Sequence, residues 1–236
     1  MPDASDAIVL EDVAVELDGH RILEDVSVRL DQRRIGVIGA NGSGKSTFAR
    51  LLDGLVAPSR GTVTVHGIDA ARDVRALRER VGFVFTNPDA QILMPTVAED
   101  VALSLRGAGL GKAEVAERVQ AQLERHGLAE LADRAAYSLS GGQKQLLALV
   151  SVLIRGPRLV VADEPTTLLD LGNARRMADL LVSPPEEGGI DAQVVVVTHD
   201  LDLAARCDVV VRFADGRLAE VGDPAAIVDR YRLEFA

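Results

Sequence analysis

The sequence has one cysteine, Cys207, no tryptophan, and only 3% aromatic residues. A single cysteine cannot form an internal disulfide, so we expect a fold stabilised by its apolar core in a reducing compartment, the cytoplasm. Long apolar runs are also missing. The best candidate, residues 146–154, contains Ser151 and is about half of the roughly 20 residues that a membrane-spanning helix needs. No membrane-spanning segment is therefore expected in this sequence.

Positive charge is scarce as well. The 26 Lys and Arg residues face 36 Asp and Glu residues, which gives a net charge of -10. Nucleic-acid binding depends on Lys and Arg neutralising phosphates, so we expect no nucleic-acid partner. Apolar residues make up 47% of the 236 residues, enough for the core of one large domain. We therefore expect a single domain over residues 1–236.

The apolar pattern changes along the chain. Alternation over residues 8–17 and 22–30, with Asp18-Gly19 between them, predicts two antiparallel strands at the edge of a sheet. Later apolar runs at residues 34–38, 81–85, 159–162 and 192–197 alternate with helical patterns, which indicates a mainly parallel sheet. Residues of approximately 97–155 have a helical pattern. The predicted fold class is α/β, with an N-terminal antiparallel β subdomain and an inserted helical subdomain.

A glycine-rich segment lies between the strand at residues 34–38 and a helical pattern. It fits the phosphate-loop pattern G-x-x-x-x-G-K-[ST], in the strand–loop–helix context that this pattern requires. Backbone N–H groups of such a loop surround phosphates, its lysine reaches the β and γ phosphates, and its serine can ligate Mg²⁺. The expected ligands are a nucleoside triphosphate and Mg²⁺. The predicted binding residues are Gly39, Asn41, Gly42, Ser43, Gly44, Lys45, Ser46 and Thr47.

Two carboxylates, Asp163 and Glu164, follow the apolar strand at residues 159–162. Ligands of open α/β sheets bind at the carboxyl ends of the strands, so Asp163 is expected beside the phosphate loop, holding Mg²⁺. Glu164 is then placed to orient or deprotonate the attacking water. A strand that ends in Asp-Glu is by itself more often an ordinary solvated strand end. The catalytic interpretation depends on the presence of the phosphate loop in the same chain.

The sequence Leu139-Ser140-Gly141-Gly142-Gln143 is the signature motif of ATP-binding cassette ATPases, which this chain resembles over nearly its whole length. Ser140 can cap a helix, so that the positive end of this helix faces an anion. The resemblance implies that Ser140, Gly141, Gly142 and Gln143 face the nucleotide held by a second cassette subunit, identical or related, in a head-to-tail dimer. It further assigns Leu169-Asp170 to the dimer contact and His199 to a catalytic role at the γ-phosphate.

Two positions depart from the family pattern. The glutamine usual after the strand at residues 81–85 is replaced by Thr86, and Asn-Pro-Asp-Ala-Gln follows at residues 87–91. Gln91 can supply the missing amide and contact Mg²⁺, or it can be an exposed loop residue. Near the N-terminus, where the family stacks an aromatic ring on adenine, this chain has Leu17 and His20. Leu17 either contacts the base or packs in the sheet.

The segment at residues 87–91 resembles that of the ATPases of energy-coupling factor transporters. This resemblance implies an ATPase on the cytoplasmic face of the cell membrane that energises uptake of a vitamin or of a transition-metal ion. The stretch from residues 86–89 through 96–100 resembles the biotin-uptake branch, so biotin is the first solute expected. Its partners would be a transmembrane coupling protein and a substrate-binding membrane protein. The alternative is a non-transport cassette of DNA repair or translation, which the short helical interval and single phosphate loop disfavour. A small-molecule kinase would leave residues 139–143 and His199 unexplained.

Overall fold

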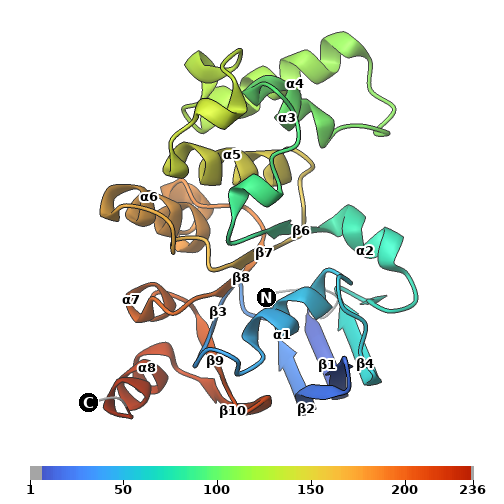
Figure 1. Ribbon diagram of the computed structural model, residues 1–236, viewed down its shortest axis with the longest axis vertical. Helices are drawn as coiled ribbons and strands as arrows, with labels where there is room; N and C mark the ends of the chain where they lie inside the picture. Colours follow the sequence, from blue (N-terminus) through green and yellow to red (C-terminus); the bar gives the residue numbers. More distant parts are fainter. Residues whose placement is uncertain (1–6, 235–236) are drawn as a thin grey trace.

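The computed structural model describes residues 7–234, which form two sheets and a helical block arranged along the long axis (Figure 1). One sheet has four strands in the order β2-β1-β4-β5. Their bounds are Ile8–Leu17 for β1, His20–Leu30 for β2, Arg60–Val65 for β4 and Ile68–Asp69 for β5. The other sheet has six strands in the order β10-β9-β3-β8-β7-β6. The α/β class predicted from the sequence is thus confirmed.

The four-stranded sheet corrects one detail. β1 was expected at an edge, but it pairs with β2 on one side and with β4 on the other. The predicted turn at Asp18-Gly19 is present, with φ angles of 51° and 75° that suit a two-residue hairpin turn. A register shift between Leu10 and Val13 keeps both apolar side chains buried. Strict alternation would have exposed one of them.

The six-stranded sheet carries the core. Its strands are Arg34–Gly39 (β3), Val81–Val84 (β6), Leu159–Asp163 (β7), Gln193–Val197 (β8), Val209–Ala214 (β9) and Arg217–Gly222 (β10). All except β10 run parallel, and β3, β7 and β8 are buried along their whole length. Val195 and Val197 pack in the cluster that contains Phe48. Val194 and Val196 pack on the other face, in the cluster that contains Met177.

Helices cover both faces of this sheet. Phe48 belongs to α1 (Lys45–Leu52) and Met177 to α6 (Leu171–Val182). The shorter helices of the α/β part are α2 (Val74–Arg80) and α7 (Leu201–Ala204). Near the C-terminus, β9, β10 and α8 (Pro224–Leu233) follow one another without having been predicted from the sequence. The hairpin between β9 and β10 turns at Asp215-Gly216, with φ angles of 47° and 74°.

The helical block lies at one end of the molecule (Figure 1) and contains α3 (Val97–Leu103), α4 (Lys112–Arg125) and α5 (Gly141–Leu153). These helices share their own apolar cluster. α5 also contributes Leu149 to the cluster on the sheet, so this helix connects the block to the α/β core. Among residues 7–234, no helix is long and apolar enough to span a bilayer. The division into one domain with an inserted subdomain stays a prediction.

Candidate active site

The predicted phosphate residues and carboxylates meet at one edge of the six-stranded sheet. The loop of residues 39–46 leaves the carboxyl end of β3, and Asp163 is the last residue of β7. His199 follows β8, two residues after Val197, which pairs with Asp163 in the sheet register. Because β3, β8 and β7 are parallel neighbours, their carboxyl ends necessarily lie side by side.

Glycine is required at two positions of the loop. A Cβ on Gly39, whose φ is 145°, would lie 2.2 Å from the carbonyl oxygen of Phe213. A Cβ on Gly44, whose φ is 99°, would lie 2.5 Å from Leu23. The loop is therefore clamped by β9 on one side and β2 on the other. Asn41 and Gly42 form its exposed tip.

Lys45 is buried and turns back over its own loop. Its Nζ donates to the carbonyl oxygens of Gly39 at 2.7 Å and Ala40 at 2.9 Å. An ammonium has three donors, so one N–H remains for a ligand. Burial lowers the pKa of Lys45, while the carboxylates of Glu164 and Asp163 raise it. The side chain is thus held in place, with a cationic donor at the loop.

The first turn of α1 is open to an anion. Gly44 is its N-cap and makes no side-chain hydrogen bond to the helix, so the first N–H groups are left without a side-chain cap. Ser43 adds a buried hydroxyl with no hydrogen-bond partner. Unpaired buried polar groups cost free energy, and a phosphate oxygen would satisfy this one. Thr47 follows on α1 and is half-buried.

Ser46 and Asp163 have the spacing of a Mg²⁺ site. The Ser46 hydroxyl donates to Asp163 Oδ1 at 3.0 Å. Adjacent ligands of octahedral Mg²⁺, with bonds of about 2.0–2.1 Å, are about 2.9 Å apart, so these two oxygens fit the ion. Burial raises the pKa of Asp163, and the hydrogen bond from Ser46 and the charge of Arg50 lower it.

Glu164 and His199 form a pair beside this site. Glu164 Oε2 lies 2.7 Å from His199 Nδ1 and accepts hydrogen bonds from the His199 backbone N–H at 3.3 Å and the Thr167 hydroxyl at 3.0 Å. Glu164 has a φ of 53°, an unfavourable left-handed conformation. Its backbone N–H donates to the Val197 carbonyl at 2.9 Å, which holds this conformation. The carboxylate is partly shielded and the imidazole exposed.

The two residues considered for the missing glutamine have different surroundings. The Thr86 hydroxyl donates to the Asp163 carbonyl at 2.8 Å, so Thr86 lies at the end of β7. Gln91 Oε1 accepts the Phe85 N–H at 3.2 Å, and its Nε2 donates to the Ala148 carbonyl at 3.3 Å. Both ends of the Gln91 amide are thus bonded to backbone, and the structure does not bring this residue together with Ser46 and Asp163.

The signature residues begin α5. Ser140 Oγ accepts the Gln143 N–H at 3.3 Å, and Gln143 Oε1 accepts the Ser140 N–H at 3.0 Å, a reciprocal capping box. Ser140 and Gly141 are exposed. A Cβ on Gly142 would lie 2.4 Å from the Asn173 side chain, so α6 approaches α5 at this glycine. Asp170 accepts the Asn173 N–H at 3.0 Å and caps α6.

Neither of the two residues considered for the adenine contact, Leu17 and His20, is buried in the sheet. Leu17 is 43% exposed, so it does not pack in the sheet, and His20 is exposed as well. Sequence reasoning missed the support of the loop by β9 and β10, where Gly216 N–H donates to the Ser43 carbonyl at 3.2 Å. The valine run at residues 209–211 and the Asp-Gly pair at 215–216 were the available signal.

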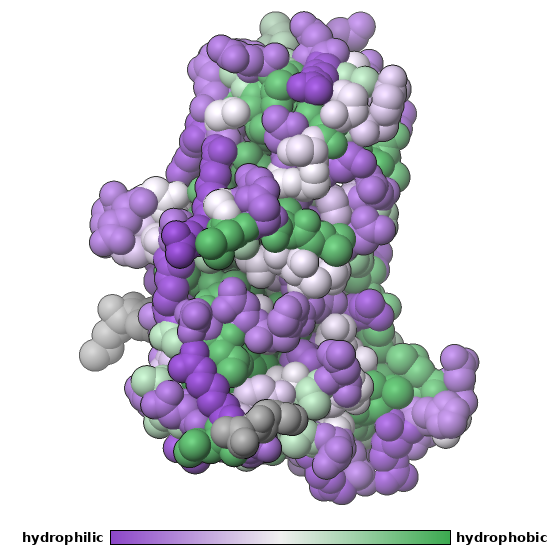
Figure 2. Space-filling model, turned by 60° about the vertical axis from the view of Figure 1, so that its left-hand side comes forward, coloured by the Kyte–Doolittle hydropathy of each residue, from purple (hydrophilic) through white to green (hydrophobic). Residues whose placement is uncertain are grey.

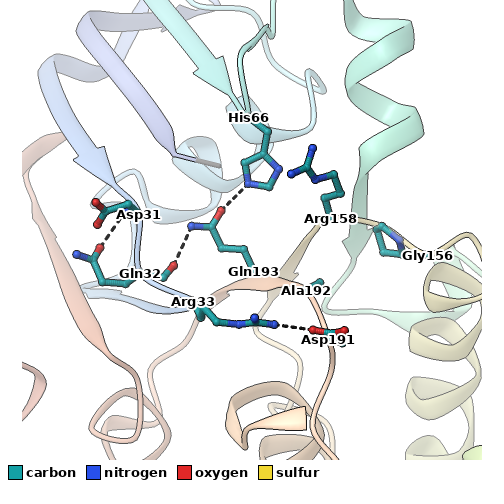
Figure 3. Close-up of a pocket in the computed structure, with 10 residues that line it drawn as sticks. Asp31, Gln32, Arg33, His66, Gly156, Arg158, Asp191, Ala192 and Gln193 are labelled. Carbon is teal, nitrogen blue, oxygen red and sulfur yellow. Dashed lines mark hydrogen bonds and ion pairs between the residues drawn. The ribbon is translucent and has the colours of Figure 1, made fainter. Parts of the chain in front are cut away.

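A cavity of about 560 Å³ lies at the other end of the parallel strands, where their amino ends meet. Its walls include Arg33, Arg158 and Ala192 (Figure 3), which directly precede β3, β7 and β8. His66 Nε2 lies 2.7 Å from Gln193 Oε1 on its wall. Ligands of parallel sheets bind at the carboxyl ends of strands, so the size of this cavity does not indicate the nucleotide site. A cavity of about 290 Å³ does lie at the carboxyl ends of the strands, and it is lined by Gly39, Asn41 and His199.

An open helix start, a glycine loop with its lysine, and a hydroxyl–carboxylate pair define a phosphate-loop nucleotide-binding protein. Comparison with protein families narrows this class to one family. Residues 23–167 match the ABC transporter family, and the chain belongs to this family. The resemblance read from residues 139–143 is thereby confirmed, while the roles of individual residues stay predictions.

Similar proteins include transporter ATPases of two named kinds. The chain is 46% identical to the biotin transport ATP-binding protein BioM of Rhizobium etli, over 85% of this chain and 86% of the relative. It is 39% identical to an energy-coupling factor transporter ATP-binding protein of Lacticaseibacillus paracasei, over 82% and 69%.

Two solved structures share the fold. One is cbiO1 of Clostridium perfringens, part of the ABC transporter complex cbiONQ, with a TM-score of 0.84, 29% identity, and coverage of 96% of this chain and 92% of the other. The other is a dimeric ATP-binding cassette bound to ADP and Pi, with a TM-score of 0.78, 28% identity, and coverage of 92% and 98%.

Proposed function

We propose that this chain is the ATP-hydrolysing subunit of an energy-coupling factor importer, with biotin as the first solute to test. The observation that carries the proposal is the joining of the phosphate loop, Asp163, Glu164 and His199 at one sheet edge, in a chain that also exposes the signature at the start of α5. Similarity to a biotin transport protein and to energy-coupling factor ATPases supports the choice of transporter and solute.

In the proposed mechanism, Lys45 and the N–H groups of the loop and α1 bind the β and γ phosphates. Ser46 and Asp163 would hold Mg²⁺, which neutralises charge on the phosphates. Glu164 accepts a proton from a water molecule. The oxygen of this water bonds to the γ-phosphorus while the bond between the γ-phosphorus and the β–γ bridging oxygen breaks, which gives ADP and phosphate. His199 Nδ1 lies 2.7 Å from the Glu164 carboxylate and orients it, and the exposed imidazole ring faces the place proposed for the γ-phosphate.

The site is completed by a second cassette, which a second copy of this chain can supply. Ser140 and Gly141 are exposed at the start of α5, where backbone N–H groups can face a γ-phosphate bound to the partner. Leu168 and Leu171 flank the predicted dimer contact at Leu169-Asp170 and are 63% and 69% exposed. Figure 2 shows a group of hydrophobic residues, in green, which is bordered by hydrophilic residues about halfway up the molecule. Such residues favour association with another protein surface.

The test is co-purification from membranes combined with uptake. The tagged chain should fractionate with the cell membrane, on its cytoplasmic face. Two integral membrane proteins should co-purify with it: a coupling protein and a solute-binding protein. Cells should take up labelled biotin with the parent chain and lose this uptake with Glu164→Gln. The proposal is wrong if the chain binds Mg-ATP yet no integral protein accompanies it and no vitamin or metal-ion uptake depends on Glu164.

A further inference from the structure

The cavity of about 560 Å³ at the amino ends of the parallel strands has no part in the proposed mechanism. It lies where the two sheets meet. Residues 31–33 connect β2 to β3, His66 follows β4, and residues 156–158 and 191–193 lie at the starts of β7 and β8. The volume is in the range of about 300–1,000 Å³ that is usual for small-molecule sites. Volume alone identifies no ligand, so the polar groups of the wall have to.

The side chain of Gln193 can adopt only one orientation in this wall. It is buried, and its Nε2 donates to the Gln32 carbonyl at 2.8 Å. The reverse orientation would place two acceptor oxygens against each other. Gln193 Oε1 therefore faces His66, at 2.7 Å from Nε2 of the imidazole (Figure 3). Because this oxygen only accepts, His66 carries its hydrogen on Nε2, and in the neutral imidazole Nδ1 is then an acceptor.

The Nδ1 atom of His66 is left without a hydrogen bond. It has no partner among residues 7–234, although His66 is only 5% exposed, and a buried acceptor without a donor costs free energy. His66 also has a φ of 49°, a left-handed conformation that is uncommon for residues other than glycine. Its backbone N–H donates to the Ala7 carbonyl at 3.0 Å, which holds the residue there. The structure thus fixes an unused acceptor on the cavity wall.

Arg158 brings positive charge to the same place. It lines the cavity, and in Figure 3 its guanidinium extends toward the side of the His66 ring that faces away from Gln193. A guanidinium has five N–H donors and a geometry that suits a carboxylate, so it can bind a ligand oxygen in addition to its other contacts. Arg33 and Asp191 form an ion pair at 2.8 Å, so their charges largely cancel. The wall therefore presents an acceptor and a cationic donor that face one another.

We propose that this cavity binds a small hydroxycarboxylate, at a site separate from the nucleotide site. The hydroxyl of the ligand donates to Nδ1 of His66, and its carboxylate binds the guanidinium of Arg158. An amine could also donate to Nδ1, but the nearby guanidinium disfavours a second positive charge. A carboxylate without a hydroxyl would leave Nδ1 without a donor. The bound ligand connects the four-stranded sheet, through His66, to the six-stranded sheet, through Arg158, and so stabilises the folded chain.

Calorimetric titration with L-malate and with succinate tests the hydroxyl, because the two dicarboxylates differ only in that group. We expect the parent chain to bind L-malate about tenfold more tightly than succinate, since succinate leaves the buried acceptor without a donor. L-malate at ten times its dissociation constant should also raise the melting temperature by about 4 °C, because it binds only the folded chain. Equal affinities for the two acids, or no binding of L-malate, would overturn the proposal.

His66→Asn removes the acceptor and keeps the turn, because asparagine readily adopts the left-handed conformation. This variant should bind L-malate and succinate equally. Arg158→Gln should weaken the binding of both acids about tenfold while their ratio stays the same. The matched control Arg75→Gln, on α2 with a side chain that is 93% exposed, should bind like the parent. A preference for L-malate that persists in His66→Asn would contradict the role given to Nδ1.

Competition with ADP separates the cavity from the phosphate loop, which also binds anions. The affinity for L-malate should be the same with and without saturating ADP, since the loop lies at the carboxyl ends of the strands and the cavity at their amino ends. If ADP displaces L-malate, the acid binds in the phosphate loop and the proposal is overturned. The titrations with L-malate and succinate need neither nucleotide nor membrane proteins, so their failure is distinct from failure of the proposed function.

Discussion

α1 and α5 both begin at glycine-rich sequences, yet their first turns are completed in opposite ways. α1 starts at Gly44 without a side-chain cap, next to buried Ser43 and Lys45. α5 starts at Ser140, which caps it reciprocally with Gln143, and this end is exposed. The start of α1 has buried groups that are free to bind an anion, whereas the start of α5 is capped by its own side chains and exposed to solvent. The difference between the two helix starts supports the proposal that each of them supplies a different part of a nucleotide site shared by two chains.

Glu164→Gln should give the largest effect, because it removes the chemistry while leaving both helix starts intact. The amide keeps the size of the side chain and can accept the His199 contact, but it cannot take the proton. We expect the hydrolysis rate to fall about 10³-fold with ATP affinity nearly unchanged. Steady-state hydrolysis and ATP titration measure both. Glu187→Gln, on an exposed turn, is the control, and hydrolysis at the parental rate would remove Glu164 from the mechanism.

Lys45→Ala tests the α1 side alone. Loss of a charge-assisted contact to the phosphates should cost about 3 kcal/mol, which is a roughly 100-fold weaker ATP affinity. Calorimetric titration of the purified chain with Mg-ATP measures it. The matched control is Lys112→Ala, at the exposed start of α4, which should bind like the parent. Equal affinities in the two variants would contradict the assignment of the loop.

Ser140→Ala tests the α5 side. Removing the cap should cost about 1 kcal/mol and weaken ATP-dependent association about fivefold, with ATP affinity of the isolated chain preserved. Sedimentation with and without Mg-ATP provides the measurement. Asp73→Ala removes an equivalent cap from α2, where the Asp73 side chain accepts the Ala76 N–H, and should leave association unchanged. If both variants weaken association equally, the signature has no special role.

The last prediction concerns the pH dependence of stability in the helical block that carries α5. Burial, together with Arg125 and Arg176, lowers the pKa of His126 to about 4. The free imidazole titrates near 6.5, so the unfolded chain binds the proton first. The contribution of His126 to stability is therefore complete above pH 6.5 and is lost as the pH falls toward 4. Urea unfolding from pH 7 to pH 4.5 should show a shallower pH dependence in His126→Gln than in His20→Gln; equal slopes would contradict the shift.

The phosphate loop was predictable because its residues are consecutive and its function is local. The contact of Ser46 with Asp163 followed from parallel strands, whose carboxyl ends share one edge. The surroundings of Gln91 could not be predicted, because its partner Ala148 lies 57 residues away on a helix whose orientation depends on core packing. For the same reason, the clamp on Gly39 by Phe213 was not foreseen, although the strand that carries Phe213 has a clear valine pattern.

The central claim is that each nucleotide site combines Lys45 of one chain with Ser140 of another, and mixing two inactive variants tests it most directly. In a dimer of Lys45→Ala with Ser140→Arg, one site carries both changes and the other carries neither. Half of the dimers in an equal mixture are of this mixed kind, so roughly a quarter of the parental hydrolysis should return. Hydrolysis in the mixture no higher than in either variant alone would contradict the account.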